Sequence, residues 1–278
     1  MIRKKRLNRL GTGLFTFISI FYVLPVVVVL FNSFKKKSYI NLEPFKLPNE
    51  TTFTGLDNYA TAINQYDFLK AVGWTVFITV GSVIVILLCT SMCAWFITRV
   101  RTRVTKAIYI LCVFSMVVPF QMVMFTLSLV TDRLGLGTPW GLIIIYLGFG
   151  AGLAVFMFCG FVKSIPIEIE EAAMIDGCSP IRTFFSVVLP IMKPTYISVG
   201  ILETMWIWND FLLPYLTLDI KKYKTISIVI QYMKGSYGRV DMGAIMAALI
   251  MAVIPVVIFY LSCQKHIIKG VAAGAVKG

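Results

Sequence analysis

Five uncharged, strongly apolar runs constrain this chain more than any other feature of its sequence. They cover residues 10–34, 71–98, 107–131, 134–162 and 242–264. A helix of about 20 apolar residues crosses the hydrocarbon core of a bilayer and satisfies its own backbone hydrogen bonds there. With 58% hydrophobic residues and a mean hydropathy of +0.85, the chain also has too few polar residues to cover a soluble globule. The sequence therefore predicts an all-α polytopic membrane protein.

A sixth apolar run, residues 194–216, is interrupted by Glu203 and Asp210. Counting it gives six transmembrane helices, which puts both termini on the same side. Lys and Arg gather on the cytoplasmic side of membrane proteins, and a cytoplasmic N-terminus gives 15 basic residues inside against 11 outside. We therefore expect both termini in the cytoplasm. The net charge of +13 then favours contact with anionic lipid and an internal partner rather than with nucleic acid.

The sequence contains few residues from which a catalytic site could be formed. The single histidine, His266, lies near the C-terminus and excludes a Ser-His-Asp arrangement within the spans. No phosphate-binding GxxxxGK[ST] loop occurs, and the six cysteines indicate neither a disulfide framework nor a CxxC metal site. We expect no catalytic residue, no metal site and no cofactor bound by this chain.

The polar segment of residues 163–193 separates two of the spans and has clear helix signals. Pro166 suits the first turn of a helix because its missing N–H has no intrahelical partner there. Glu168, Glu170 and Glu171 place negative charge near the positive end of the helix dipole. Gly177 can adopt the left-handed conformation that ends a helix. These signals predict a helix over residues 166–176.

A second short helix follows the corner at Gly177. Ser179 is a good N-cap and Pro180 a good first residue, and the helix should continue through Val188 until Pro190 stops it. Its apolar face must be covered. Two arrangements would do this: an amphipathic helix lying on lipid, or insertion into a soluble partner.

The spacing of residues in this loop resembles the EAA loop of binding-protein-dependent ABC importer permeases. The residues that carry the resemblance are Glu171, Ala172, Ala173, Gly177, Val187, Leu189 and Pro190. The family usually has Ile where Val187 stands, a change of one methylene. Three further segments resemble the maltose-type subgroup, which imports sugars and oligosaccharides. These are the DNY run of residues 57–59, the WNDF run of residues 208–211 and the tail of residues 269–278.

The resemblance implies a type I ABC importer transmembrane domain. It would cover residues 70–262, with the coupling loop at residues 163–193. Residues 1–69 would form a cytoplasmic tail, the first transmembrane helix and an external segment, and residues 263–278 a cytoplasmic tail. Within that tail the resemblance implies contacts to the ATPases from Ala272, Gly274, Lys277 and Gly278.

The implied function is one half of an ATP-driven sugar or oligosaccharide importer in the bacterial cytoplasmic (inner) membrane, working by alternating access. The implied partners are a second homologous permease, two cytoplasmic ABC ATPase subunits that hydrolyse ATP with Mg, and an extracytoplasmic solute-binding protein. The external segments, residues 35–70 and 215–241, would meet the binding protein or form a solvated cap.

The polar residues of the fifth span have two interpretations. Glu203, Trp206 and Asp210 share one helix face, and carboxylates within a span are expected to face the bundle interior or a wet cavity. They would line a substrate pathway, or they would bond to neighbouring helices and stabilise the bundle. Gln121, close to Pro119 in the third span, is a weaker pathway candidate.

Two functional alternatives stay open. The same machinery could import glycerol 3-phosphate or a related polar solute, because the outer segments carry more basic than acidic residues. A different class, an ion-coupled secondary transporter, would use Glu203 and Asp210 as proton or cation sites. Dependence of uptake on ATP rather than on an ion gradient separates these classes.

Overall fold

The computed structural model describes residues 2–235 and 240–275, and the side chains of residues 11–235 and 240–265. These residues form helices, with one isolated antiparallel bridge between Lys35 and Phe53. The chain divides into two compact units. Unit 1 combines Met1–Lys70 with Ile228–Val257, and unit 2 combines Ala71–Ser227 with Ile258–Gly278.

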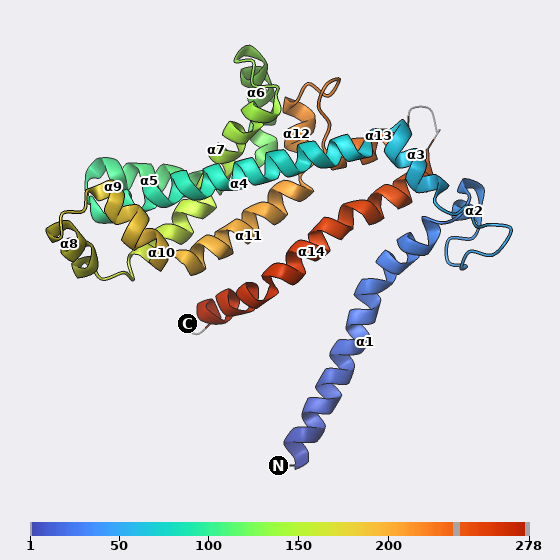
Figure 1. Ribbon diagram of the computed structural model, residues 1–278, viewed down its shortest axis with the longest axis horizontal. Coiled ribbons are helices and arrows are strands. Elements are labelled where there is room, and N and C mark those ends of the chain that lie inside the picture. The colour runs from blue at the N-terminus through green and yellow to red at the C-terminus, as the bar shows by residue number, and fades with distance from the viewer. Residues whose placement is uncertain (1, 236–239, 276–278) are drawn as a thin grey trace. The chain divides into compact units, whose positions relative to one another are not determined.

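Among the described residues, four helices are long and apolar enough to cross a membrane, and the count rises to six if each of two bent pairs is one span. The four are α1 (Ile2–Asn32), α4 (Phe68–Arg99), α7 (Pro139–Val162) and α14 (Met242–Ala275). The bent pairs are α5 (Arg103–Ser115) with α6 (Phe120–Arg133), and the helical run Pro180–Ile191 with α11 (Lys193–Asn209). The predicted class, an all-α polytopic membrane protein, is confirmed, and Figure 1 shows its helices in sequence colours.

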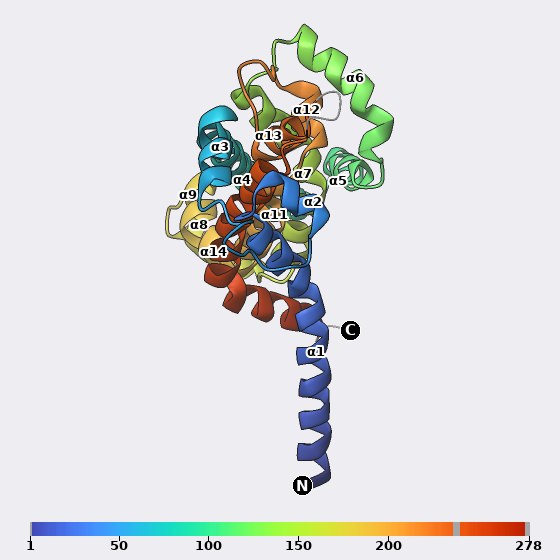
Figure 2. The same cartoon turned by 90° about the vertical axis from the view of Figure 1, so that its right-hand side faces the viewer.

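The apolar run of residues 107–131 is not one continuous helix. It breaks between Ser115 and Phe120, and the axes of α5 and α6 differ by 105°, a corner that Figure 2 shows from the side. Pro119 is the N-cap of α6 and has extended backbone angles, φ −62° and ψ 137°. Proline lacks an N–H for the preceding turn and disfavours helical geometry in the residue before it, so the helix ends here.

The span predicted at residues 194–216 is also two helices. α11 ends at Asn209, and α12 covers Leu212–Thr217. Asp210 between them has an extended backbone, and its Oδ1 accepts a hydrogen bond from the Leu212 N–H at 3.0 Å. A short carboxylate side chain competes for nearby backbone N–H groups and therefore favours the end of a helix over its interior.

Within unit 2, small residues on α7 allow close helix packing. A Cβ on Gly152 would lie 2.6 Å from Met116 Cγ and 2.7 Å from the Cys112 carbonyl oxygen of α5. A Cβ on Gly150 would lie 2.7 Å from Ile86 Cδ1 of α4. The small residues at both positions let α7 approach α4 and α5 closely, and at Gly152 a backbone carbonyl leaves no room for a side chain.

Unit 1 holds a folded segment between α1 and α4. It includes α2 (Lys37–Leu42) and α3 (Asp57–Gln65). Asn58 holds the start of this segment in place. Its Nδ2 donates hydrogen bonds to the carbonyl oxygens of Ser33 and Lys35, both at 2.8 Å. Lys35 is 1% exposed, and its Nζ donates to the Glu43 carbonyl oxygen at 2.8 Å. Burial lowers the pKa of Lys35, and the nearby Glu43 carboxylate opposes part of that shift.

We expect Asn58→Ala to destabilise the protein by about 1–3 kcal/mol, because two part-buried carbonyl groups lose their donor. Asn64→Ala is the matched control, since Asn64 is exposed on the same helix. The measurement is denaturant-induced unfolding of both purified variants in the same detergent. Equal unfolding midpoints would show that Asn58 does not hold this segment.

Candidate functional site

The loop between α7 and α11 has the two-helix form that the sequence predicts. α8 covers Ile167–Ile175, one residue shorter at each end than predicted, with Pro166 as its N-cap. Gly177 has φ +85°. The Gly177 N–H donates to the Met174 carbonyl oxygen and the Cys178 N–H to the Ala173 carbonyl oxygen, both at 3.0 Å. This pair of bonds is the Schellman arrangement that ends a helix at a left-handed glycine.

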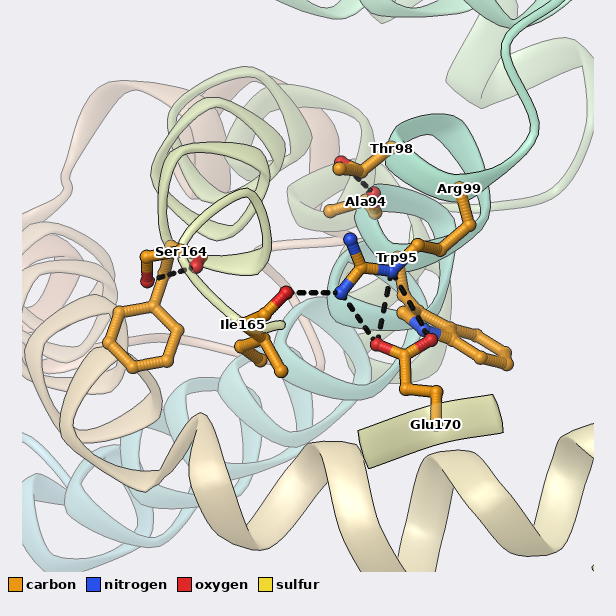
Figure 3. Close-up of polar contacts among 8 residues, drawn as sticks. Ala94, Trp95, Thr98, Arg99, Ser164, Ile165 and Glu170 are labelled. Carbon is orange, nitrogen blue, oxygen red and sulfur yellow. Dashed lines mark hydrogen bonds and ion pairs between the residues drawn. The ribbon is translucent and has the colours of Figure 1, made fainter. Parts of the chain in front are cut away.

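Glu170 anchors α8 to the end of α4, as Figure 3 shows. The residue is 2% exposed, and its carboxylate receives hydrogen bonds from Arg99 and Trp95. Arg99 Nη2 lies 2.7 Å and Arg99 Nε 3.0 Å from Glu170 Oε1, and Trp95 Nε1 lies 2.9 Å from Oε2. Arg99 Nη2 also donates to the carbonyl oxygen of Ile165, just after α7, at 2.9 Å. One guanidinium therefore joins α4, the end of α7 and α8.

Sequence reasoning missed this role of Glu170 and treated the residue only as charge at a helix start. A signal was available, because Trp95 and Arg99 are four residues apart on one face at the end of a span. Two strong donors at that position require an acceptor from elsewhere in the chain. The sequence does not say which of the neighbouring glutamates supplies it.

Part of the apolar face of the second loop helix packs against this chain itself, whereas Ile181 and Phe185 remain exposed. Ser179 caps α9 (Pro180–Thr183) by accepting from the Arg182 N–H, as predicted. Phe184 and Val188 are fully buried, and the Phe184 ring lies 5.5 Å from the ring of Trp95. Neither of the two predicted coverings, lipid or a soluble partner, is needed for these residues.

Pro190 does not stop the second helix, which corrects the prediction. A π-helical turn, η1 (Phe184–Val188), precedes α10 (Leu189–Ile191), and Pro190 lies inside α10. The Leu189 N–H donates to the Phe184 carbonyl oxygen, five residues back. A π-turn shifts the hydrogen-bond register just before the proline that lacks an N–H, so the helical run continues to Ile191.

The remaining residues of the predicted coupling pattern differ in exposure. Glu171, Ala172 and Pro190 are exposed, and Ala173, Val187 and Leu189 are half-buried. Ile175, at the C-terminal end of α8, is 86% exposed. With Glu170 turned inward, the opposite face of α8 presents a mixed apolar and acidic surface that no described residue covers.

The predicted pathway residues of α11 lie near α7. The Tyr146 hydroxyl donates to Asp210 Oδ2 at 3.0 Å, and the Tyr146 ring meets the Trp206 ring edge-on at 5.5 Å. Glu203 is 2% exposed and lies beside Gly150, where an added Cβ would be 3.0 Å from Glu203 Oε2. Trp206 remains 42% exposed. Tyr146 is a member of this cluster that sequence reasoning did not identify, because its link to Asp210 spans 64 positions.

The other predicted residues lie apart from that cluster in sequence and surroundings. Gln121 is exposed in the first turn of α6, just after the corner at Pro119. Ala272 and Gly274 belong to the last part of α14, whereas Lys277 and Gly278 lie outside the described residues.

A polar cavity of about 620 Å³ lies where the α6–α7 connection meets α12 and the residues after it. Asp132, Asp219, Lys222 and Tyr223 contribute polar groups to its lining. The connection is held by the Asp219 N–H, which donates to the Gly137 carbonyl oxygen at 2.9 Å.

Comparison with known proteins assigns the chain to a family. Residues 86–273 match the family described as binding-protein-dependent transport system inner membrane component. The chain belongs to this family of transport permeases. The match includes the whole loop of residues 163–193 and all of α11.

Two curated permeases align with nearly the full chain. The probable starch degradation products transport system permease protein AmyC of Thermoanaerobacterium thermosulfurigenes is 38% identical over 277 residues, which cover 99% of this chain and 98% of that protein. The multiple sugar-binding transport system permease protein MsmG of Streptococcus mutans is 36% identical over 266 residues, which cover 93% of each.

A solved structure shares the fold of this permease. The crystal structure of a bacterial ABC transporter involved in the import of the acidic polysaccharide alginate aligns with a TM-score of 0.76 and 19% identity. The alignment covers 94% of this chain and 96% of that one.

We expect Glu170→Ala to destabilise the permease by about 2–4 kcal/mol, because it leaves the Arg99 guanidinium with little compensation at a side-chain exposure of 17%. Glu168→Ala, on the exposed face of the same helix, should change stability by less than about 0.5 kcal/mol. Thermal unfolding of the purified variants measures both.

Glu170→Gln is a useful intermediate, because an amide oxygen still accepts a hydrogen bond but carries no charge. It should lie between the wild type and Glu170→Ala in stability. If Glu170→Ala and Glu168→Ala unfolded at the same temperature, the contacts of Glu170 would contribute nothing measurable to stability.

Proposed function

We propose that this chain is one permease subunit of an ATP-driven importer for sugars or oligosaccharides. It pairs with a second homologous permease to form the translocation pathway, and it receives solute from an extracytoplasmic solute-binding protein. The names of the relatives support this, because AmyC is described as carrying starch degradation products and MsmG multiple sugars. A further solved structure with the same fold is an alginate ABC transporter in complex with a periplasmic protein that holds an alginate pentasaccharide.

One observation carries the proposal: the loop of residues 163–193 is anchored on one side, and the part of the chain that the structure describes leaves its other side uncovered. Glu170 bonds inward to Arg99 and Trp95, while Glu171, Ala172 and Ile175 face outward. A segment that only connects two spans needs neither a buried anchor nor an exposed face. A surface that transmits force needs both, because it must bind a partner and must stay fixed to the bundle when the partner moves.

In this proposal the partners at the loop are two ATPase subunits, which bind and hydrolyse ATP with Mg and close against each other. Movement of α8 reaches α4 through the Glu170–Arg99 ion pair. Movement of the second loop helix reaches α11 directly, because the runs Pro180–Ile191 and Lys193–Asn209 meet end to end at a bend of 78°. The loop therefore acts on two spans at once and drives alternating access.

The cluster at the other end of α11 belongs to the proposed solute pathway. Asp210 is held by Tyr146 and by the Leu212 N–H, so its first role is to shape the break between α11 and α12. Glu203 packs against Gly150, and its Oε2 has no hydrogen-bond partner among the described residues. Trp206 is the pathway candidate that the geometry favours, because an exposed indole provides an apolar face on which a sugar ring can stack.

The orientation follows from the loop. If the ATPases are cytoplasmic, α8 lies on the cytoplasmic side, both termini lie there as well, and the polar cavity beside Asp132 and Asp219 opens outward toward the solute-binding protein. The C-terminal residues Ala272, Gly274, Lys277 and Gly278 then reach the ATPases, and the chain spans the bacterial cytoplasmic membrane among its lipids.

The test is uptake in proteoliposomes that contain this chain, its sister permease and the ATPase subunits, with maltotriose and the solute-binding protein outside. Uptake is expected with ATP inside and not with an ion gradient alone. In the same vesicles, Gly177→Asp should lower the maltotriose carried per ATP about fivefold, because a side chain at φ +85° costs about 1 kcal/mol and disfavours the corner.

Gly177→Asn is the matched control, since asparagine has the size of aspartate without its charge and, after glycine, is the residue found at the left-handed position that ends a helix. It should retain most of the coupling. Uptake by this chain alone, or uptake that follows the ion gradient without ATP, would disprove the proposal. Uptake of glycerol 3-phosphate in place of maltotriose would keep the mechanism and change the substrate class.

The tail role has its own test, removal of residues 270–278. We expect at least a twofold loss of binding-protein-stimulated ATPase activity, because the truncated end of α14 no longer reaches the ATPases. The amount of assembled complex in the membrane is measured alongside. Unchanged ATPase activity and uptake would remove the tail from the mechanism.

A further inference from the structure

A second cavity in unit 2, of about 390 Å³, is strongly basic. It lies where the end of α4, the start of α5 and the end of α7 meet, and Lys163 is the one lining residue that belongs to the loop of residues 163–193. Arg101, Lys106 and Lys163 line it, together with the Tyr109 side chain and an inner wall that includes Thr98 and Cys159. No carboxylate lines this cavity.

The three cations are unneutralised within the described chain. Arg101, Lys106 and Lys163 form no ion pair and no side-chain hydrogen bond with a described residue. Arg99, only two positions from Arg101, contrasts with them because Glu170 and the Ile165 carbonyl oxygen occupy its guanidinium. Counting Arg103, the sequence places five cations at this edge of the bundle, and the fold supplies an anion for one of them, Arg99.

The hydroxyl groups beside the cavity do not need a ligand. Thr102 and Thr105 cap α5 reciprocally, and Thr105 Oγ1 also donates to the Val100 carbonyl oxygen at 2.6 Å. Thr98 Oγ1 donates to the Ala94 carbonyl oxygen at 2.7 Å. The unused binding capacity is cationic, with the Tyr109 hydroxyl as one further donor, which is the donor set that suits a phosphate group.

We propose that this pocket binds a phosphate group, carried by an anionic phospholipid whose headgroup lies at the membrane surface. Two features favour a lipid source. The pocket lies at the ends of two membrane-spanning helices, at the level where headgroups lie. Basic pockets between transmembrane helices at the cytoplasmic surface are also recognised sites for anionic headgroups. A soluble phosphate compound offers the same chemistry, and the experiment separates the two sources.

This inference relies on the proposed function only for the side of the membrane on which the pocket lies. Binding is measured without ATP or transported solute, so failure of the transport proposal leaves the result readable.

The experiment titrates the delipidated, purified transporter with dioctanoyl phosphatidylglycerol and follows bound lipid by native mass spectrometry. The pocket variant is Lys106→Gln with Lys163→Gln. The matched control is Arg103→Gln with Lys193→Gln, which also removes one cation from the first turn of α5 and one from the end of a span. Neither control residue lines the cavity, and both are exposed.

We expect the pocket variant to bind phosphatidylglycerol at least about tenfold more weakly than the wild type, since each basic residue near an anionic headgroup contributes appreciably to binding. The control variant should bind as the wild type does, and dioctanoyl phosphatidylcholine should not discriminate between the variants. Lys106→Arg with Lys163→Arg should restore binding, because it keeps both charges and so separates charge from folding.

Two soluble probes, inorganic phosphate and glycerol 3-phosphate, identify the source. If millimolar amounts of either displace the lipid from the wild type and also bind in its absence, the phosphate site stands and its ligand is soluble. If neither displaces the lipid, the phospholipid is the ligand. Equal lipid binding by the pocket variant and the control variant would overturn the proposal.

Discussion

The ion pair between Arg99 and Glu170 is the contact on which the arrangement of the loop depends. A carboxylate that is 2% exposed is costly to bury unless donors surround it, and Arg99 and Trp95 provide them. The same guanidinium also binds the Ile165 carbonyl oxygen at the end of α7. The loop is thereby fixed to two spans at its first helix, and Phe184 and Val188 fix its second helix against Trp95.

Because Glu170 fixes one face of α8 to the bundle, the opposite face of α8 is available to a partner. Because Glu170 is used internally, the outward residues of α8 contribute little to the fold, and their exposure is consistent with a surface reserved for partner subunits. The neighbouring cations follow the same division of roles. Arg99 is neutralised and structural, whereas Arg101, Lys106 and Lys163 surround a cavity without a counter-charge from the described chain. We therefore propose different roles for two adjacent parts of this edge, force transmission for the loop and binding of an anionic group for the cavity.

The interruptions of the spans are where backbone chemistry overrides hydrophobicity. Pro119 turns one apolar run into α5 and α6 at 105°, and Asp210 ends α11 with an extended residue. Pro190, by contrast, lies within a helical run, because the π-helical turn before it shifts the hydrogen-bond register. Each of these residues was visible in the sequence as a potential break, but whether it ended a helix depended on the hydrogen bonds available around it. Asp210 gained the Leu212 N–H and the Tyr146 hydroxyl, which stabilise the end of the helix.

The sequence by itself determined the features that depend on neighbouring residues in the chain. The apolar runs predicted the helical membrane class, and the Ser179 cap and the left-handed Gly177 predicted the bent loop, because each depends on residues within one or two helical turns. Only the tertiary structure decided that Glu170 rather than Glu171 is the anchor, that Phe184 and Val188 are covered by this chain, and that Tyr146 holds Asp210. Glu170 and Glu171 are neighbours of identical chemistry, and a rotation of about 100° between them sets which one faces Arg99. That choice depends on a partner 71 positions away, and no local pattern encodes how two distant helices lie against each other.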